Sequence, residues 1–235
     1  MHTPSITRLL TFSAALAVAA ATTHAAIITW GPATTISGDA DVSTAGTLVN
    51  AVNIGAAGVG STTVNGVTFD PLAFGNNVTS GNFNITTTGV FNSFNNRTPP
   101  SGPFLSLSAP YKALLSSVGL TGGTTFTLTM SGLAVGANYE FEWWSNVSTG
   151  AASLTGAFAG VVVALNSRTG GVGGLGQFAV GTFTADGPTQ AVLFNGPGSN
   201  YLNAAQLRQT SVVPEPGTAF FGLALCGVAG LRRRR

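Results

Sequence analysis

Apolar and polar positions alternate along two segments in the middle of the chain. Residues 124–130 place Phe126, Leu128 and Met130 on one face and threonines on the other. Residues 138–144 alternate in the same way, because successive side chains of a strand point to opposite faces. Both segments are therefore predicted to be strands with one face turned to a core.

The second strand divides its large side chains between two faces. Tyr139, Phe141 and Trp143 share one face, which we expect to be buried. Glu140, Glu142 and Trp144 share the other face, which we expect to be exposed to solvent. Any chemistry on this strand is therefore predicted to lie on the second face.

Turn signals divide the chain at intervals typical of sheets. Asn65-Gly66 separates two β-rich runs and predicts a type I′ hairpin. A short helix is predicted over 110–118, and loops over 75–103 and 168–176. Further strands are predicted over 27–30, 47–54, 158–165, 178–185, 189–194 and 201–208, with a hairpin turn at 186–188.

Many short strands with almost no helical pattern indicate an all-β domain. Antiparallel strands at this spacing form a β-sandwich or jelly roll. We expect this domain to span residues 26–212, between two sorting segments at the ends of the sequence.

The first segment, 1–25, has the pattern of a signal peptide. Arg8 precedes an apolar, alanine-rich run, and small residues follow up to Ala25, after which cleavage is expected. The run is short for a membrane span. The segment is therefore predicted to form a signal helix that directs export through the Sec machinery and is then removed by signal peptidase.

The last segment, 213–235, combines three features in order. Val213, Pro214, Glu215 and Pro216 form a rigid break, and the apolar run 217–231 follows. The chain then ends on Arg232, Arg233, Arg234 and Arg235, a cationic stop that favours the cytoplasmic side of a membrane. These features predict a C-terminal membrane helix.

The sequence VPEPGTAFFGLALCGVAGLRRRR resembles the PEP-CTERM sorting signal of Gram-negative bacteria. The resemblance implies recognition by an exosortase-type membrane protease and cleavage near Pro-Glu-Pro. It predicts a protein that is transiently anchored in the inner membrane and then released to the cell surface or extracellular matrix.

The body of the chain is similar to surface proteins of planctomycete and verrucomicrobial bacteria. That resemblance implies a sandwich like the galactose-binding or lectin-like jelly rolls. It rests on the segments 39–44, 46–49, 65–69, 181–186 and 202–208.

Charge is scarce, at 7% of residues, and most basic residues lie near the ends. Between the two sorting segments four basic residues face six acidic ones, a balance of 4 minus 6, or −2. Binding to nucleic acid requires a clustered basic surface. Nucleic acid is therefore excluded as a partner.

Two common catalytic chemistries are also excluded. Both histidines, His2 and His24, lie in the predicted leader, and the single cysteine, Cys226, lies in the tail. The domain therefore lacks the side chains for a histidine-based triad or a zinc site. We expect no enzyme activity and no cofactor, apart from structural calcium as an alternative.

Calcium has one candidate site. Asp39 and Asp41 flank a single residue, so their oxygens could reach the same hard cation, although a plain polar loop is the favoured interpretation.

The face of Glu140, Glu142 and Trp144 supports two further alternatives. Trp144 could stack on a sugar ring while Glu140, Glu142 or Asn146 accept hydrogen bonds from sugar hydroxyls, unless Trp144 simply packs under a loop. The two glutamates could instead approach glycosidase geometry.

Three functions follow from the sequence. The main hypothesis is a structural or matrix-interaction protein. The alternatives are a carbohydrate-binding module, with extracellular polysaccharide as its partner, and, less favoured, a glycoside hydrolase.

Overall fold

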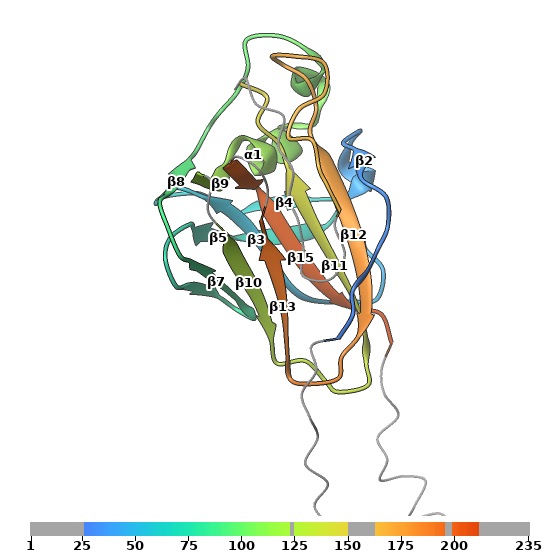
Figure 1. The fold of residues 1–235 in the computed structure, drawn as a ribbon. Helices are drawn as coiled ribbons and strands as arrows, with labels where there is room; N and C mark the ends of the chain where they lie inside the picture. The colour runs from blue at the N-terminus through green and yellow to red at the C-terminus, as the bar shows by residue number, and fades with distance from the viewer. Residues whose placement is uncertain (1–25, 123–124, 150–162, 196–198, 212–235) are drawn as a thin grey trace, which may run out of the picture.

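A computed structural model describes residues 26–122, 125–149, 163–195 and 199–211 of the chain. The fold is all-β, with strands gathered into three sheets (Figure 1). None of the helices that these residues form is long and apolar enough to cross a membrane. The predicted signal peptide and C-terminal membrane helix lie outside the described residues.

The largest sheet forms one layer of the sandwich. Its strands run in the order β1-β12-β11-β15-β3-β5-β4, with β2 also paired to β12. All pairings are antiparallel except that of β3 with β5. The strands are β1 (Thr29–Trp30), β2 (Thr34–Thr35), β3 (Thr47–Gly55), β4 (Thr62–Val64), β5 (Val67–Ala73), β11 (Asn138–Ser145), β12 (Gln177–Thr184) and β15 (Ala204–Gln209).

Two smaller sheets accompany it. One has the order β13-β10-β7-β6 and the other β14-β9-β8. Their strands are β6 (Val78–Ser80), β7 (Phe83–Thr87), β8 (Phe91–Phe94), β9 (Val118–Gly122), β10 (Phe126–Ser131), β13 (Thr189–Phe194) and β14 (Ser199–Leu202). The helical elements are η1 (Asp39–Asp41), η2 (Pro103–Ser106) and α1 (Ala109–Ser116).

The main core lies between the large sheet and the β13-β10-β7-β6 sheet. Tyr139, Phe141 and Trp143 of β11 are buried in it, as the alternation predicted. Phe126 of β10 stacks on Phe194 of β13 at a centroid distance of 4.4 Å. Burial of these aromatic rings, which are among the largest apolar side chains, joins the two layers.

A second core covers the opposite face of the large sheet. It includes Phe69, Phe104, Tyr111 and Trp144, together with Leu114 of α1. Helix α1, η2 and the segment that contains Ile36 and Val42 supply this cover. The large sheet is therefore packed on both faces, whereas the sequence pattern suggested a solvated second face.

The hairpin at Asn65-Gly66 is confirmed. Val64 pairs with Val67, and both turn residues have positive φ, 47° at Asn65 and 75° at Gly66. Positive φ at both central positions is what a type I′ turn requires. The helix predicted over 110–118 is confirmed as α1, which begins one residue earlier and ends two residues earlier, with Ser108 as N-cap and Val118 already in β9.

Four expectations are corrected. Residues 75–103 are not one loop but contain β6, β7 and β8. The run 201–208 is two strands separated at Asn203. The turn at 186–188 connects two sheets instead of closing a hairpin, because β12 pairs with β11 while β13 pairs with β10. Residues 163–165 are not a strand, and the rest of the strand predicted over 158–165 lies outside the described residues.

Candidate functional site

Trp144 is fully buried, so the exposed sugar platform expected from the sequence is wrong. Its ring packs edge-on against Phe69 at 5.6 Å and stacks near Phe178 at 6.3 Å. Its indole Nε1 donates a hydrogen bond to the Tyr111 hydroxyl at 3.0 Å. The alternative, in which Trp144 packs under neighbouring elements, is the one that the structure shows.

Asn146 is also buried and serves the backbone rather than a ligand. Its Nδ2 donates to the Leu115 carbonyl at 3.1 Å, and its Oδ1 accepts from the Gly176 amide at 2.9 Å. Asn203 lies beside it and accepts from the Asn146 backbone amide at 2.6 Å. These bonds tie the end of β11 to the end of α1 and to the loop over residues 168–176.

Glu142 lies on the same face of β11 and is completely buried. Its Oε2 accepts hydrogen bonds from the Ser43 amide at 3.1 Å and from the Gln206 side-chain amide. Its Oε1 has no hydrogen-bond partner among the described residues. Both partners are neutral, so burial dominates and raises the pKa of Glu142 to about 8.

Glu140 and Glu142 therefore do not form an open hydrolytic site. Glu140 is only partly exposed, and Glu142 is sealed beneath residues 37–46, which we call the covering segment. A general acid or nucleophile must reach the scissile bond. The glycosidase geometry, the less favoured alternative for this pair, is not present.

Asp39 and Asp41 belong to η1, inside the covering segment. Asp41 accepts hydrogen bonds from the Ser37 amide and hydroxyl at 2.6 Å each, from the Gly38 amide at 3.0 Å and from the Tyr111 hydroxyl at 3.2 Å. Asp39 accepts from the Ser108 hydroxyl at 2.6 Å. Donors thus occupy the oxygens that a cation would need.

These aspartates do not fit a calcium cage. Seven or so oxygen ligands are typical for calcium. Among the described residues there is no group of three or more side chains of the metal-binding types. The two carboxylates instead fasten the covering segment to α1, whose Tyr111 hydroxyl stays a donor because burial and the Asp41 charge raise the pKa of Tyr111.

Arg208 fixes the other end of the covering segment. Its guanidinium donates to the carbonyls of Thr44, Ala45 and Gly46. Gln206 on the same strand donates to the Ser43 carbonyl at 3.1 Å. Polar side chains of β11 and β15, namely Glu142, Gln206 and Arg208, thus hold the covering segment against the large sheet.

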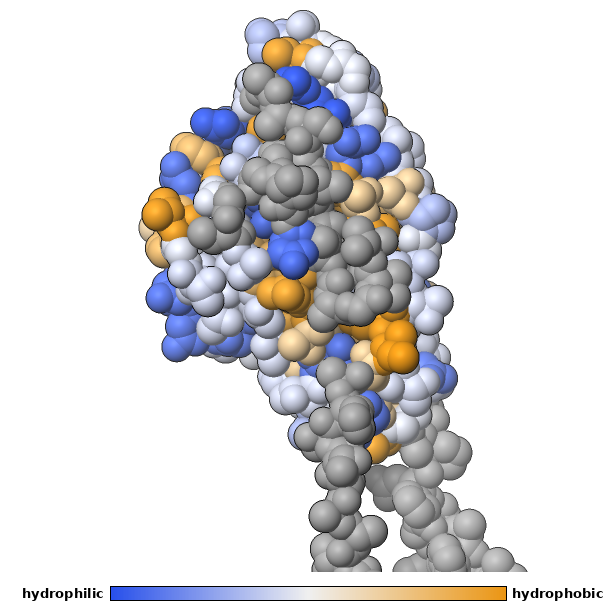
Figure 2. Space-filling model, viewed as in Figure 1, coloured by the Kyte–Doolittle hydropathy of each residue, from blue (hydrophilic) through white to orange (hydrophobic). Residues whose placement is uncertain are grey.

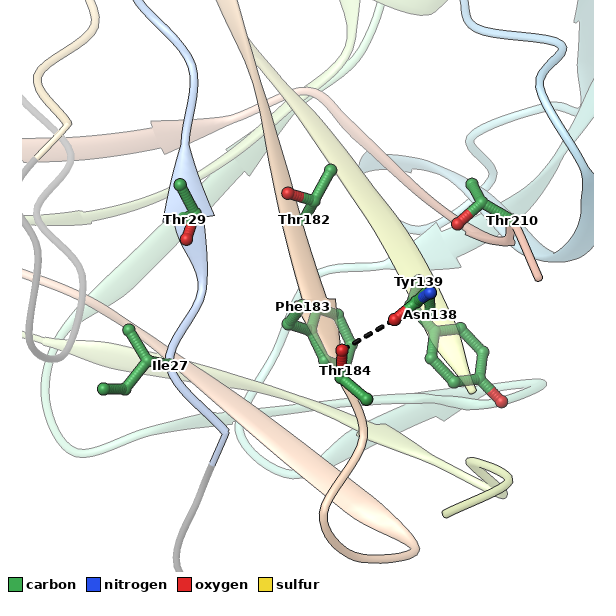
Figure 3. Close-up of a pocket in the computed structure, with 8 residues that line it drawn as sticks. All are labelled: Ile27, Thr29, Asn138, Tyr139, Thr182, Phe183, Thr184 and Thr210. Atoms are coloured by element: carbon green, nitrogen blue, oxygen red, sulfur yellow. Dashed lines mark hydrogen bonds between the residues drawn. The ribbon is translucent and has the colours of Figure 1, made fainter. Parts of the chain in front are cut away.

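An open pocket of about 320 Å³ lies at the end of the large sheet (Figure 3). Strands β1, β12 and β11 contribute Thr29, Thr182, Thr184 and Asn138 to its lining, and Thr210 adds a further hydroxyl. No charged side chain lines it. Thr184 donates a hydrogen bond of 2.6 Å to Asn138 across the two strands (Figure 3).

Sequence reasoning missed these residues. The available signal was the alternation of Thr182 and Thr184 on one strand, which places both hydroxyls on one face. The pairing of Thr29 with Thr182 and of Asn138 with Thr184 is a product of tertiary structure. Threonines are too common in this chain for their positions alone to mark a site.

The predicted sorting residues, Val213 to Pro216 and Arg232 to Arg235, lie outside the described residues. In comparisons with known proteins, no family model, curated protein or solved structure matches this chain.

Proposed function

We propose that this chain is an exported bacterial protein of the cell surface or extracellular matrix, with a structural or interaction role. The observation that carries the proposal is the order of three tail features: Val213-Pro214-Glu215-Pro216, an apolar run and four arginines. The resemblance of this tail to PEP-CTERM signals implies processing by an exosortase-type protease after export through the Sec pathway.

The character of the domain supports this proposal. Its visible surface is mostly pale or blue, with apolar residues in separate places (Figure 2). Exposed strand positions carry threonine and asparagine more often than charge, as at Thr182 and Thr184 of β12. A neutral polar surface suits a protein that works outside the cell among polymers rather than nucleic acids.

The finer topology belongs to the same proposal. We place the sandwich with the jelly rolls of the galactose-binding or lectin-like type, on the resemblance of segments such as 202–208 to bacterial surface proteins. The Trp144 face, Glu140 and Glu142 are no longer part of the proposed function, because the structure buries or covers them.

Intact-mass analysis of the exported protein tests this function. In cells that contain the sorting protease, the mass is expected to correspond to loss of 1–25 and of the tail from a cut near Pro214. Without the protease, the tail should remain. Glu215→Gln should also leave the tail attached, whereas Asp186→Asn, a matched neutralisation in an exposed turn, should be processed normally. A tail that stays attached in every strain contradicts the proposal.

A further inference from the structure

The pocket of Figure 3 is built on an ordered array of neutral polar side chains. Thr29 faces Thr182 across β1 and β12, and Thr184 faces Asn138 across β12 and β11. Side chains directly opposite on neighbouring strands lie about 5 Å apart, and those two residues apart on one strand about 7 Å. The array therefore covers an area comparable to one sugar ring.

The polar atoms of this array are available to a ligand. The hydroxyls of Thr29 and Thr182 make no hydrogen bond with other described residues. Asn138 Oδ1 accepts from Thr184, and no described residue accepts from Asn138 Nδ2. The array thus offers both donors and acceptors, which is the pattern that vicinal hydroxyl groups can satisfy.

The lining excludes most other ligand classes. A phosphate or carboxylate needs a cation or a cluster of backbone amides, and a cation needs carboxylates; neither lines the pocket. A purely apolar ligand would leave the hydroxyls and the amide without water or partners. A neutral ligand rich in hydroxyl groups remains.

The array is held in place by the core beneath it. Tyr139 and Phe183 stack at 5.5 Å on the inner face of the same strands. The Tyr139 hydroxyl accepts from the Ala134 amide at 2.8 Å. Ile27, 81% exposed, adds an apolar surface at the edge of the pocket, against which the C–H groups of a sugar can pack.

A second pocket, of about 340 Å³, adjoins the first through Thr210. It is lined by Gly46, Thr47, Gln209 and Ser211, which again carry no charge. The Thr210 amide donates to the Asn138 carbonyl at 2.8 Å, so the residue that the two pockets share is fixed to β11. Together the pockets offer room for more than one sugar unit.

We infer that the groove of Thr29, Thr182, Thr184, Asn138 and Thr210 binds an uncharged saccharide chain. This inference rests on the proposed extracellular function and names the class of its partner. Hydrogen bonds to the hydroxyl and amide array give recognition. Glu140, which lies opposite Thr182 on β11, selects against uronic acids and sulfated sugars.

Titration of the mature, exported protein with oligosaccharides tests the inference. The neutral probes are maltotetraose, cellotetraose and mannotetraose, and the acidic probes are oligomers of alginate and polygalacturonate. Binding is followed by nuclear magnetic resonance shifts of backbone amides in β1, β11 and β12. We expect at least one neutral probe to shift these amides and the acidic probes to leave them unchanged.

Matched valine variants locate the site. Thr182→Val removes one hydroxyl with little change in shape and should weaken binding about fivefold or more, because a sugar hydroxyl loses its partner. Thr127→Val makes the same change on β10, in the other sheet, and should bind as the wild type does. The inference is overturned if no neutral probe binds, if acidic probes bind more tightly, or if Thr182→Val binds normally.

The proposed function and the saccharide-binding inference can be contradicted separately. Loss of saccharide binding leaves export and tail cleavage untouched, since those depend on residues 1–25 and 213–235. An unprocessed tail likewise leaves the groove intact.

Discussion

Glu142 shows how the environment of a residue decides its role. The alternation of β11 places it beside Trp144, as the sequence predicted, but its carboxyl group is buried under the covering segment and bonded only to neutral partners. A carboxylate in such surroundings is destabilised in its charged form. Glu142 therefore stabilises the fold as a neutral acid rather than acting on a substrate.

This burial makes stability depend on pH. The pKa of Glu142 is about 8 in the folded protein and near the ordinary value of 4.5 in the unfolded chain. Between these values the folded state binds more protons, so the contribution of Glu142 is fully present below pH 4.5 and is lost as the pH rises through about 8. The free energy of unfolding by urea, measured from about pH 5 to about pH 9, should fall as the pH rises toward about 8 and level off above it.

Two variants separate Glu142 from other groups. Glu142→Gln has no titrating proton, so the fall in unfolding free energy between about pH 5 and about pH 8 should become shallower. Asp70→Asn, which changes an exposed carboxylate on β5, should keep the wild-type slope. An identical slope in wild type and Glu142→Gln would show that Glu142 is already ionised at neutral pH.

At the scale of elements, sequence signals succeeded where they were local. The turn Asn65-Gly66, the helix capped by Ser108 and the buried face of β10 all follow from neighbouring residues. The strands within 75–103 were missed because asparagine, threonine and glycine dominate there, although Phe83 and Ile85 alternate on one face of β7.

The candidate site was harder to predict because alternation separates two faces without saying what covers each. Trp144 and Glu142 were correctly placed on one face of β11, but α1 and the covering segment, distant in sequence, bury that face. The groove shows the converse: Thr29 and Thr182 become neighbours only because β1 pairs with β12. Long-range pairing of this kind leaves no local signal.

The hairpin gives a test of backbone strain alone. Gly66 has φ of 75°, and a Cβ added there would meet no atom within 4 Å. Gly66→Ala should therefore cost about 1–2 kcal/mol of unfolding free energy through its left-handed conformation. Gly60→Ala is the matched control, because the space around it is equally open and its φ lies outside the left-handed region. Equal effects in the two variants, measured by chemical denaturation, would contradict the type I′ turn.

At the scale of the whole molecule, the domain depends on packing and sheet hydrogen bonds. The described residues contain no cysteine, and charged residues are few. Both faces of the large sheet are covered by apolar clusters. Stability of this origin differs from that of small secreted domains held by disulfides.

Because packing and sheet hydrogen bonds stabilise the domain, we expect its stability to be independent of reductant and nearly independent of salt. Dithiothreitol should leave the midpoint of thermal unfolding unchanged for the processed domain. Raising NaCl from low concentration to about 0.5 M should change the unfolding free energy by less than about 0.5 kcal/mol, because screening acts on few charge pairs. A larger loss on addition of salt would reveal an ion-pair network that contributes to the fold.

The first and last described residues emerge at the same end of the sandwich, as Ile27 and Thr210 show by lining one pocket, whereas α1 lies toward the other end (Figure 1). A body suspended from its tail would therefore hold its saccharide groove close to the lipid surface and point α1 outward. Cleavage would then free the domain together with any glycan it had already captured beside the bilayer.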